Sequence, residues 1–316
     1  MMLYAAPMEG ITGYLFRNTF DRYFGNSIDK YFSPFIMSHE KIGMSNKEIA
    51  DVLPEHNSEL KLIPQVMTNS ASEYLQIEET LTDFGYDEIN LNCGCPSKTV
   101  VTKKRGAGIL NDTDMLDRML YGIFEKSKVS ISVKTRIGFV STDEYFDLIS
   151  IYNKYDLKEL IVHPRLQNEY YAGVPHYDIY KEIEKSSKNT LIYNGNVFSV
   201  VDYQRITGEI ISEKTDGVML GRGLIGNPFL AGMISDGTVP DKKTLLMFLE
   251  ELTQVYEDNF SGDLPVLFKM KEIWGMINHE DMIYDSIFEF DKKDLKKLKK
   301  CSSLNEFKTI QNMLLE

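Results

Sequence analysis

The sequence is poor in cysteine and proline and contains no long hydrophobic run. Three cysteines in 316 residues, of which Cys93 and Cys95 nearly adjoin, are too few for a disulfide framework or a complete zinc site. The 10 prolines and 21 glycines are too few and too scattered for a disordered or fibrous chain. We therefore expect a protein that is stabilised by its buried core, holds no metal and resides in the reducing cytoplasm.

Signals for membranes and secretion are also missing. No stretch approaches the roughly 18 uncharged apolar residues that a membrane span requires, so we expect no membrane partner. The N-terminal MMLYAAPMEG has no basic segment and soon reaches Glu9, so we expect no secretory signal. The net charge of -12 argues against a wholly basic nucleic-acid-binding protein, but it allows a basic strip on an acidic body.

Short β-rich runs alternate with longer amphipathic stretches over about the first 225 residues, and this alternation predicts a (β/α)8 TIM barrel. The expected strands span residues 3–8, 30–35, 62–67, 88–93, 130–136, 159–164, 190–194 and 216–220. Several of them are apolar on both faces, as in a parallel sheet that helices cover. The alternative is an open doubly wound sheet, but no GxGxxG motif follows the first strand.

The composition changes after Gly237. Residues 238–241 read as a linker, and the remaining residues form helix-like stretches without β-rich runs. We therefore predict a catalytic barrel domain at 1–237 and a small C-terminal helical bundle at 241–316. Trp274, together with Phe268 and Ile273, is expected in the core of that bundle.

The ends of the expected strands are unusually polar, and in a (β/α)8 enzyme these ends form the active site. The richest is INLNCGCPSK, residues 89–98. A thiol on such a turn, Cys95, could act as nucleophile, proton donor or metal ligand, or could simply be a small buried side chain. The pair Cys93 and Cys95 lacks the further ligands that zinc needs.

Two other strand ends carry cations. Lys134 and Arg136 lie on the same side of a strand, because side chains alternate, and a lysine inside a barrel mouth needs an anionic partner. The motifs YNGNV (193–197) and MLGRGLIGNPFL (219–230) contain glycines that allow close approach of a bound group. This is the usual phosphate site of the fold, and Arg222 suits phosphate oxygens, although the glycines could serve tight turns alone.

In this order, the motifs resemble those of the tRNA-dihydrouridine synthases. They are APMEGIT (6–12), Phe16 with Arg17, PQVM (64–67), NLNCGCPSK (90–98), VKTRIG (133–138), His163, NGN (194–196) and GRGLIGNPFL (221–230). The resemblance covers the whole barrel, whereas the helical tail fits the family less specifically. It implies an FMN enzyme that reduces the C5–C6 double bond of particular uridines in tRNA, with NADPH as the electron source.

The resemblance also implies roles for individual residues. The residues that would hold the flavin are Pro7, Met8, Glu9, Gln65, Lys134, His163, Asn194, Gly195, Asn196, Gly221 and Arg222. Asn92 would contact the target uracil, and Cys95 would deliver a proton to C5 after hydride has reached C6. A thiol with an ordinary pKa of about 8.5 is mostly protonated at neutral pH and suits this role. The uracil must leave the tRNA fold to reach the flavin.

Basic residues are expected to bind the tRNA. Lys98 and Arg105 belong to KTVVTKKR (98–105), which reads as a flexible basic loop beside Cys95. Arg165 follows His163 at a strand end and is expected on the substrate side. A helix over KKDLKKLKK (292–300) would present lysines around a buried leucine face. The lysines expected to contact tRNA are Lys292, Lys293, Lys296 and Lys297, although a charge run can also be only a solvated surface.

Two residues depart from the family pattern, Pro164 after His163 and Asn196 in place of an acid, and both concern the detail of flavin binding. Two other functions remain open. One is an FMN barrel reductase that acts on a small molecule, as a dihydroorotate-dehydrogenase-like enzyme does. The other is a non-catalytic RNA-binding protein, against which Cys95 and Lys134 argue. We expect the protein to be a monomer.

Overall fold

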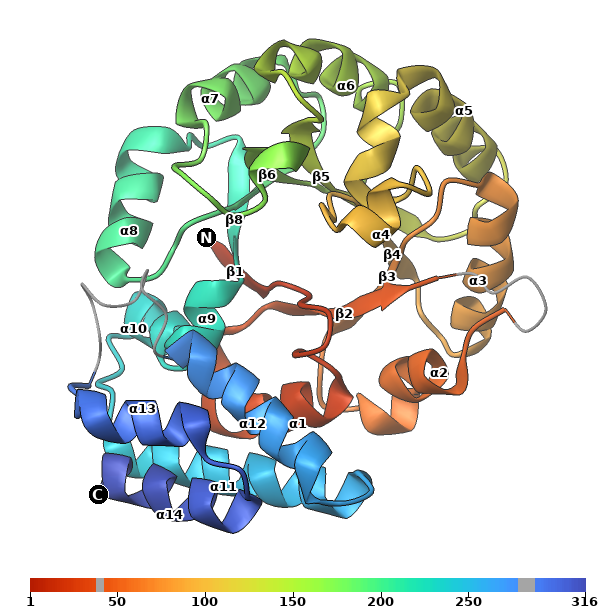
Figure 1. Cartoon of the computed structure of the whole chain (residues 1–316). Helices are drawn as coiled ribbons and strands as arrows, with labels where there is room; N and C mark the ends of the chain where they lie inside the picture. The colour runs from red at the N-terminus through yellow and green to blue at the C-terminus, as the bar shows by residue number, and fades with distance from the viewer. Residues whose placement is uncertain (38–42, 278–287) are drawn as a thin grey trace.

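The chain forms a closed barrel of parallel strands with a helical unit at its side (Figure 1). The computed structural model describes residues 1–37, 43–277 and 288–316. The strands are β1 (Met2–Ala5), β2 (Lys30–Ile36), β3 (Leu62–Val66), β4 (Glu88–Cys93), β5 (Ser130–Gly138), β6 (Leu160–Leu166), β7 (Leu191–Asn194) and β8 (Thr215–Leu220). Each strand pairs with the next in sequence, and β8 pairs with β1, which confirms the predicted barrel.

Helices surround the strands and cover their outer faces (Figure 1). They are α1 (Tyr14–Phe24), α2 (Asn46–Val52), α3 (Ala71–Asp83), α4 (Lys98–Val101), α5 (Thr113–Phe124), α6 (Tyr145–Tyr152), α7 (Tyr177–Ser186), α8 (Val200–Arg205), α9 (Arg222–Gly226) and α10 (Leu230–Ser235). Helix α5 shows why they form. Asp112 caps it by accepting a hydrogen bond from the amide of Met115, and Leu116, Leu120 and Ile123 bury one face against the barrel.

Shorter turns complete the ring. The 3-10 segments are Gly25–Ser27, Pro54–His56, Gly106–Asn111, Thr142–Glu144 and Gln167–Glu169, and a π-helical turn spans Ile206–Ile210. The main core lies between the strands and the helices, and a smaller cluster of apolar side chains fills the barrel interior. Alternation along β1 assigns Leu3 to the outer core and Tyr4 to the interior.

A buried ion cluster lies where β2, β4 and β6 begin. Lys30 Nζ lies 2.9 Å from a carboxylate oxygen of Glu88 and 2.9 Å from one of Glu159. The Tyr4 hydroxyl donates to the same Glu159 oxygen over 2.7 Å. All four side chains are buried. Because a buried charge is tolerated only when it is paired and hydrogen-bonded, Lys30 is what allows two carboxylates inside this end of the barrel.

The C-terminal helices form a unit that packs against α1 and α9 (Figure 1). They are α11 (Lys242–Asn259), α12 (Asp263–Ile277), α13 (Lys292–Lys300) and α14 (Leu304–Leu315). Phe248 of α11 joins the unit to the barrel through edge contacts with the rings of Phe20 and Phe24. The division at 237 and 241 stays a prediction, although α11 begins at Lys242.

The predictions for the bundle core were correct for two of three residues. Trp274 and Ile273 are buried, and the Trp274 indole N–H donates to Gln311 Oε1 over 2.9 Å. Phe268 was wrongly assigned to the core, since it is 64% exposed. The core face of α12 passes through Leu267, and one residue further along a helix turns a side chain by about 100°. Within the described ranges, no helix is long and apolar enough to cross a membrane.

Candidate active site

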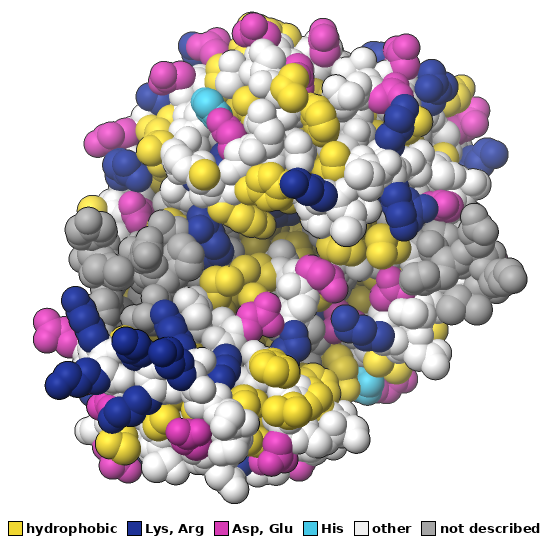
Figure 2. Space-filling model, viewed as in Figure 1, with side chains coloured by type: hydrophobic (Ala, Val, Ile, Leu, Met, Phe, Trp, Pro, Cys, Tyr) yellow, Lys and Arg dark blue, Asp and Glu magenta, His cyan; other side chains and the backbone are white. Residues whose placement is uncertain are grey.

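A cavity of about 350 Å³ opens at the carboxyl ends of the strands, where this fold places its active sites. Figure 2 shows a hollow with hydrophobic walls at this place, between the barrel loops and the C-terminal helices. The cavity brings together every residue predicted for the flavin, the uracil contact and the proton donor. These are Pro7, Met8, Glu9, Gln65, Asn92, Cys95, Lys134, His163, Asn194, Gly195, Asn196, Gly221 and Arg222.

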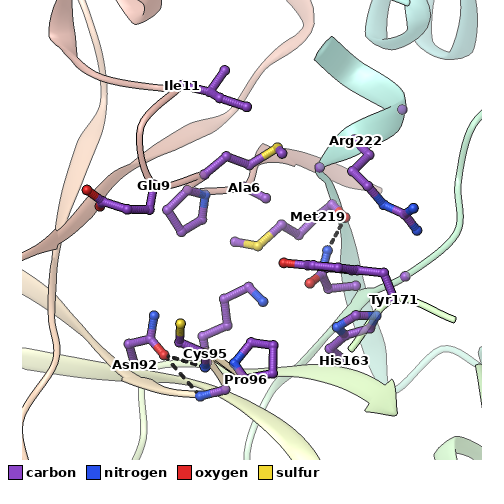
Figure 3. Close-up of a pocket in the computed structure, with 18 of the residues that line it drawn as sticks. Ala6, Glu9, Ile11, Asn92, Cys95, Pro96, His163, Tyr171, Met219 and Arg222 are labelled. Atoms are coloured by element: carbon purple, nitrogen blue, oxygen red, sulfur yellow. Dashed lines mark hydrogen bonds between the residues drawn. The ribbon is translucent and has the colours of Figure 1, made fainter. Parts of the chain in front are cut away.

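Asn92 fixes the turn that presents Cys95 to the cavity. Its side-chain oxygen accepts hydrogen bonds from the backbone amides of Gly94 and Cys95, each over 3.0 Å. Its amide nitrogen donates to Gln65 Oε1 over 2.8 Å, and Gln65 in turn donates to Asn90. Figure 3 shows Asn92 and Cys95 on one side of the cavity, with His163, Tyr171 and Arg222 on another. These hydrogen bonds between Gln65, Asn92 and the backbone therefore fix the turn from which the Cys95 thiol enters the cavity.

The two neighbouring cysteines have different environments. Burial raises the pKa of the Cys95 thiol, and nearby Arg136 and Lys134 only partly oppose this, so Cys95 is protonated at neutral pH. Cys93 lies in the outer core with no exposed surface, and burial raises the pKa of its thiol to about 12. Only Cys95 lines the cavity. Among the described residues, no group of His, Cys, Asp and Glu is arranged to hold a metal ion.

Lys134 and Arg136 both face the cavity, as strand alternation predicted. Each of the three nitrogens of the Arg136 guanidinium makes a hydrogen bond, because they donate to the backbone oxygens of Gly94, Leu166 and Tyr170 over 2.7–2.9 Å. The Lys134 ammonium has no hydrogen bond or ion pair with any residue in the described part of the chain. Burial, followed by the charge of Arg136, lowers the pKa of Lys134 to about 7. Lys134 itself is half-buried in the cavity wall. A largely desolvated amine without an anionic partner among the described residues indicates a place for a bound anion.

His163 is a neutral ring in the cavity wall. Burial, followed by the charges of Arg136 and Lys134, lowers its pKa well below the usual value. Its Nε2 lies 2.9 Å from Arg165 Nη1, a donor, so the ring accepts there and carries its proton on Nδ1.

Arg165, which we expected on the substrate side, is fully buried and is not among the residues that line the cavity. It donates to the backbone oxygens of Ala172 and Gly173 and to Asn196 Oδ1. These bonds hold the loop that follows β6. A contact between Arg165 and the substrate stays a prediction, and the Arg165 side chain has no exposed surface in this structure through which to make it.

The loops after β7 and β8 form one rigid cradle. A Cβ atom added at Gly223 would lie 2.0 Å from the backbone oxygen of Val197, so the two loops touch backbone to backbone. Asn196, with φ at 38°, accepts from both Arg165 and Arg222. The Arg222 guanidinium also lies 4.9 Å from the centre of the Tyr171 ring. Glycine backbone beside a guanidinium suits an anionic oxygen group.

Several wall residues escaped the sequence predictions. Tyr171, 52% exposed, comes from the loop after β6 and lies over Arg222 and near His163. A sequence signal for Tyr171 was available, because Tyr170 and Tyr171 are consecutive aromatic residues in a loop that follows a polar strand end. Glu272 and Met276 come from α12 and line the same cavity. Nothing in the local sequence of α12 indicated that contact.

The basic segment 98–105 is folded, which corrects the expectation of a flexible loop. Lys98–Val101 forms one helical turn. The Arg105 guanidinium pairs with both carboxylate oxygens of Glu73 at 2.8 and 2.9 Å, and Lys104 pairs with Asp112. Glu73 is distant in sequence and Asp112 follows the segment, so the composition of residues 98–105 alone did not indicate these ion pairs. Arg105 is thus held by an acid, whereas Lys98 is exposed.

The predicted basic helix is present as α13. Leu295 and Leu298 are buried, and all six lysines of the helix are exposed. Lys297 pairs with Asp294 within the helix. Figure 2 shows Lys and Arg side chains gathered over α13 on the same face as the hollow. The lysines can therefore face one ligand that also reaches the cavity.

Comparison with known proteins agrees with this site. The family model described as "Dihydrouridine synthase (Dus)" matches residues 4–282. A "Probable tRNA-dihydrouridine synthase" of Staphylococcus aureus (strain COL) is 26% identical over 71% of this chain and 68% of its own length. The "Probable tRNA-dihydrouridine synthase 2" of Bacillus subtilis (strain 168) is 24% identical over 71% of this chain and 69% of its own.

Solved structures share the fold. Histamine dehydrogenase from Rhizobium sp. 4-9 superposes with a TM-score of 0.54 and 10% identity, covering 80% of this chain and 48% of that one. That likeness concerns the barrel architecture alone. The match of the family model along most of the sequence carries the assignment. The chain therefore belongs to the dihydrouridine synthase family and is an oxidoreductase.

Proposed function

We propose that this protein reduces the C5–C6 double bond of specific uridines in tRNA to dihydrouridine, with FMN as its cofactor and NADPH as the electron source. The family assignment and the names of its relatives support the reaction. The observation that carries the proposal is that Cys95, Lys134 and the glycine cradle around Arg222 line one cavity. A proton donor, a cation for an electron-rich ring and an anion site are what this chemistry needs.

The residues present fit a flavin mononucleotide. The ammonium of Lys134, which has no partner among the described residues, suits the N1/O2 edge, which becomes negative when the flavin is reduced. The backbone of Gly195 and Gly221, with Arg222, suits the phosphate. The cavity volume of about 350 Å³ lies within the range of small-molecule sites, about 300–1,000 Å³. When bound, the flavin would supply the hydride that adds to C6 of the uracil.

Cys95 would complete the reduction by protonating C5. Its raised pKa keeps the thiol protonated at neutral pH until the uracil ring accepts hydride and becomes basic at C5. The S–H bond then breaks as the C5–H bond forms, and the resulting thiolate faces the cations Lys134 and Arg136. Asn92 positions this thiol through the amide of Cys95. One N–H of Asn92 remains available for a uracil oxygen, because the other donates to Gln65.

The tRNA would reach this cavity from the face that α13 shares with it. Lys292, Lys293, Lys296 and Lys297 of α13 would contact phosphates, and Lys98 would do so beside Cys95. The target nucleotide leaves the tRNA fold, because the uracil edge cannot reach the cavity while it is stacked. A tRNA substrate agrees with the cytoplasmic location expected from the sequence.

The test uses the purified protein and tRNA from a strain that lacks its gene. We expect a yellow protein that releases FMN on denaturation and oxidises NADPH. Mass analysis of the tRNA should show uridine in place of dihydrouridine at particular positions, and the wild-type gene should restore dihydrouridine. A flavin-bearing protein whose loss leaves tRNA unchanged would instead be a reductase of small molecules. A colourless protein that binds tRNA would be a binding protein.

A further inference from the structure

A second cavity, of about 400 Å³, adjoins the active-site cavity. It lies between the loop after β1, helix α2 and the C-terminal helices α11 and α12. The two cavities share the wall residues Glu9, Ile11, Pro34 and Phe35. Side chains that line both cavities leave only one layer of protein between them. The two cavities are therefore neighbours, and two adjoining groups of one ligand can enter one cavity each.

Aromatic rings supply much of the lining of this second cavity. They are Tyr14, Phe16, Phe35, Tyr256 and Phe260. Phe260 stacks on Tyr256 with ring centroids 5.2 Å apart and planes only 9° apart. Tyr256 is almost completely buried, whereas Phe260 is partly exposed. Phe260 therefore has a ring that is held in place by Tyr256 and is still accessible to a flat ligand.

Charged groups stand at the rim of the same cavity. Lys47 lines it, and its side chain is 84% exposed. Lys47 Nζ lies 3.8 Å from Glu9 Oε1, and Glu9 belongs to the shared wall. The Lys269 ammonium also lines the cavity and contacts the backbone oxygen of Gly10. Of these two cations, Lys47 lies beside the wall that the cavities share, next to the Glu9 carboxylate, which can accept a hydrogen bond from a base.

We propose that the second cavity binds the base of the nucleotide next to the target uridine, with the connecting phosphate at Lys47. The inference rests on the proposed function. Flipping a uridine out of its stack removes a stacking partner from its neighbour, which gains from a new aromatic surface. Proteins that read single-stranded RNA receive such bases on aromatic side chains and bond their polar edges. Phe260 provides the ring, and Glu9 accepts from an amino or imino group of the base.

The test is a double-mutant cycle in which changes in the protein are combined with changes in the RNA, and the KM for tRNA is measured for each combination. The proteins are wild type, Phe260→Ala, Lys47→Gln and the control Phe268→Ala, whose ring is exposed and lines neither cavity. The RNAs are a substrate tRNA and two versions with an abasic nucleotide directly 5′ or 3′ of the target uridine. Stacking on one aromatic side chain contributes enough affinity that its loss should raise KM by about 5- to 150-fold.

We expect Phe260→Ala to raise the KM for the intact tRNA by that factor, and Phe268→Ala to leave it within about twofold. One abasic RNA should show the same defect with wild type and no further defect with Phe260→Ala, because the two changes remove one contact. Lys47→Gln should raise KM more at low salt than at high salt. Lys47 is exposed, so this variant keeps the test valid if Phe260→Ala unfolds.

Two results would overturn the inference. Abasic and Phe260→Ala defects that multiply, or no defect from either abasic RNA, would mean that no neighbouring base enters the cavity. A higher KM of Phe260→Ala for NADPH, with oxygen as acceptor, would assign the cavity to the dinucleotide instead. Failure of the proposed function is distinguishable, because wild type would then leave the intact tRNA unreduced.

Discussion

The backbone amide of Cys95 donates a hydrogen bond to the side-chain oxygen of Asn92 over 3.0 Å. Asn92 lies one residue before the end of β4 and Cys95 lies in the turn that follows, so the bond ties the backbone of Cys95 to the barrel. The same oxygen also accepts from Gly94. A proton donor works only when it is held within reach of its target atom. The position of the thiol is therefore set before any ligand arrives.

Cys95→Ala should retain the flavin and lose nearly all reduction of tRNA. Removal of a general acid lowers the rate by about 10²–10⁴-fold, whereas the groups expected to hold the flavin stay in place. The measurement is single-turnover formation of dihydrouridine by the reduced enzyme. Cys93→Ala is the control, since Cys93 lies in the outer core. Near wild-type single-turnover rates in Cys95→Ala would remove Cys95 from the reaction.

Lys134→Met should lower the midpoint potential of the bound flavin. Only the reduced flavin carries negative charge beside this position, so loss of the cation weakens binding of the reduced form more than of the oxidised form. The potential is measured by equilibration with a reference dye in wild type and variant. Equal potentials would place Lys134 away from the flavin edge.

The contribution of Lys134 to the stability of the flavin-free protein should become more favourable as the pH rises from about 7 toward about 10. Burial lowers the pKa of Lys134 to about 7, whereas an unfolded lysine titrates near 10.5. Between these values Lys134 of the unfolded chain binds a proton that the folded chain does not, so the part of the free energy of unfolding that Lys134 contributes increases with pH. Denaturant titrations of wild type and Lys134→Met give the difference.

The free energy of unfolding of wild type, relative to that of Lys134→Met, should increase across this pH range. Lys126→Met, at an exposed position, is the matched control for loss of a lysine. A difference between wild type and Lys134→Met that stays constant with pH would show that the amine is not desolvated in the folded protein.

Replacing the four α13 lysines, Lys292, Lys293, Lys296 and Lys297, with Gln should raise the KM for tRNA and flatten its salt dependence. Each lost phosphate contact reduces the slope of log K against log salt by about 0.7–0.9. A salt titration of tRNA binding measures the slope. The control replaces four exposed lysines that precede strands at the opposite end of the barrel, at positions 126, 128, 158 and 188. Superimposable titrations for wild type and the α13 variant would mean that α13 is only a solvated surface.

Lys30→Met should destabilise the protein by about 3–5 kcal/mol, because it leaves Glu88 and Glu159 buried without their cation. The deficit should shrink in acid, where the carboxylates can take up protons. Lys308→Met is the control, since its pair with Glu257 is partly exposed and such pairs contribute about 0–1 kcal/mol. Equal losses for the two variants in urea titrations would contradict a special role of the cluster.

The fold was largely predictable because its strands and helices carry local signals. The strand Glu88–Cys93 has the predicted limits. The prediction for β5 ended at Arg136, whereas the strand continues to Gly138. The error arises because pairing with β6 extends the strand, and pairing is not a local property.

The part of the candidate site that is built from the ends of the strands was predictable from the sequence. A closed parallel barrel brings all carboxyl ends to one mouth, so motifs far apart in sequence had to converge there. Contacts between side chains from different elements were not predictable. The pair of Arg105 with Glu73, the burial of Arg165 and the arrival of Glu272 from α12 all depend on packing that no local pattern encodes.

The contribution of α12 to the cavity wall has a consequence for how the protein is made. Ribosomes release the barrel segments first, and Cys95 leaves the exit tunnel long before Glu272 and Met276 do. A nascent chain can therefore close its barrel while one side of its reaction chamber is still open to water. The chamber is complete only after α12 has been synthesised and has packed beside α9, so competence is acquired later than closure of the barrel.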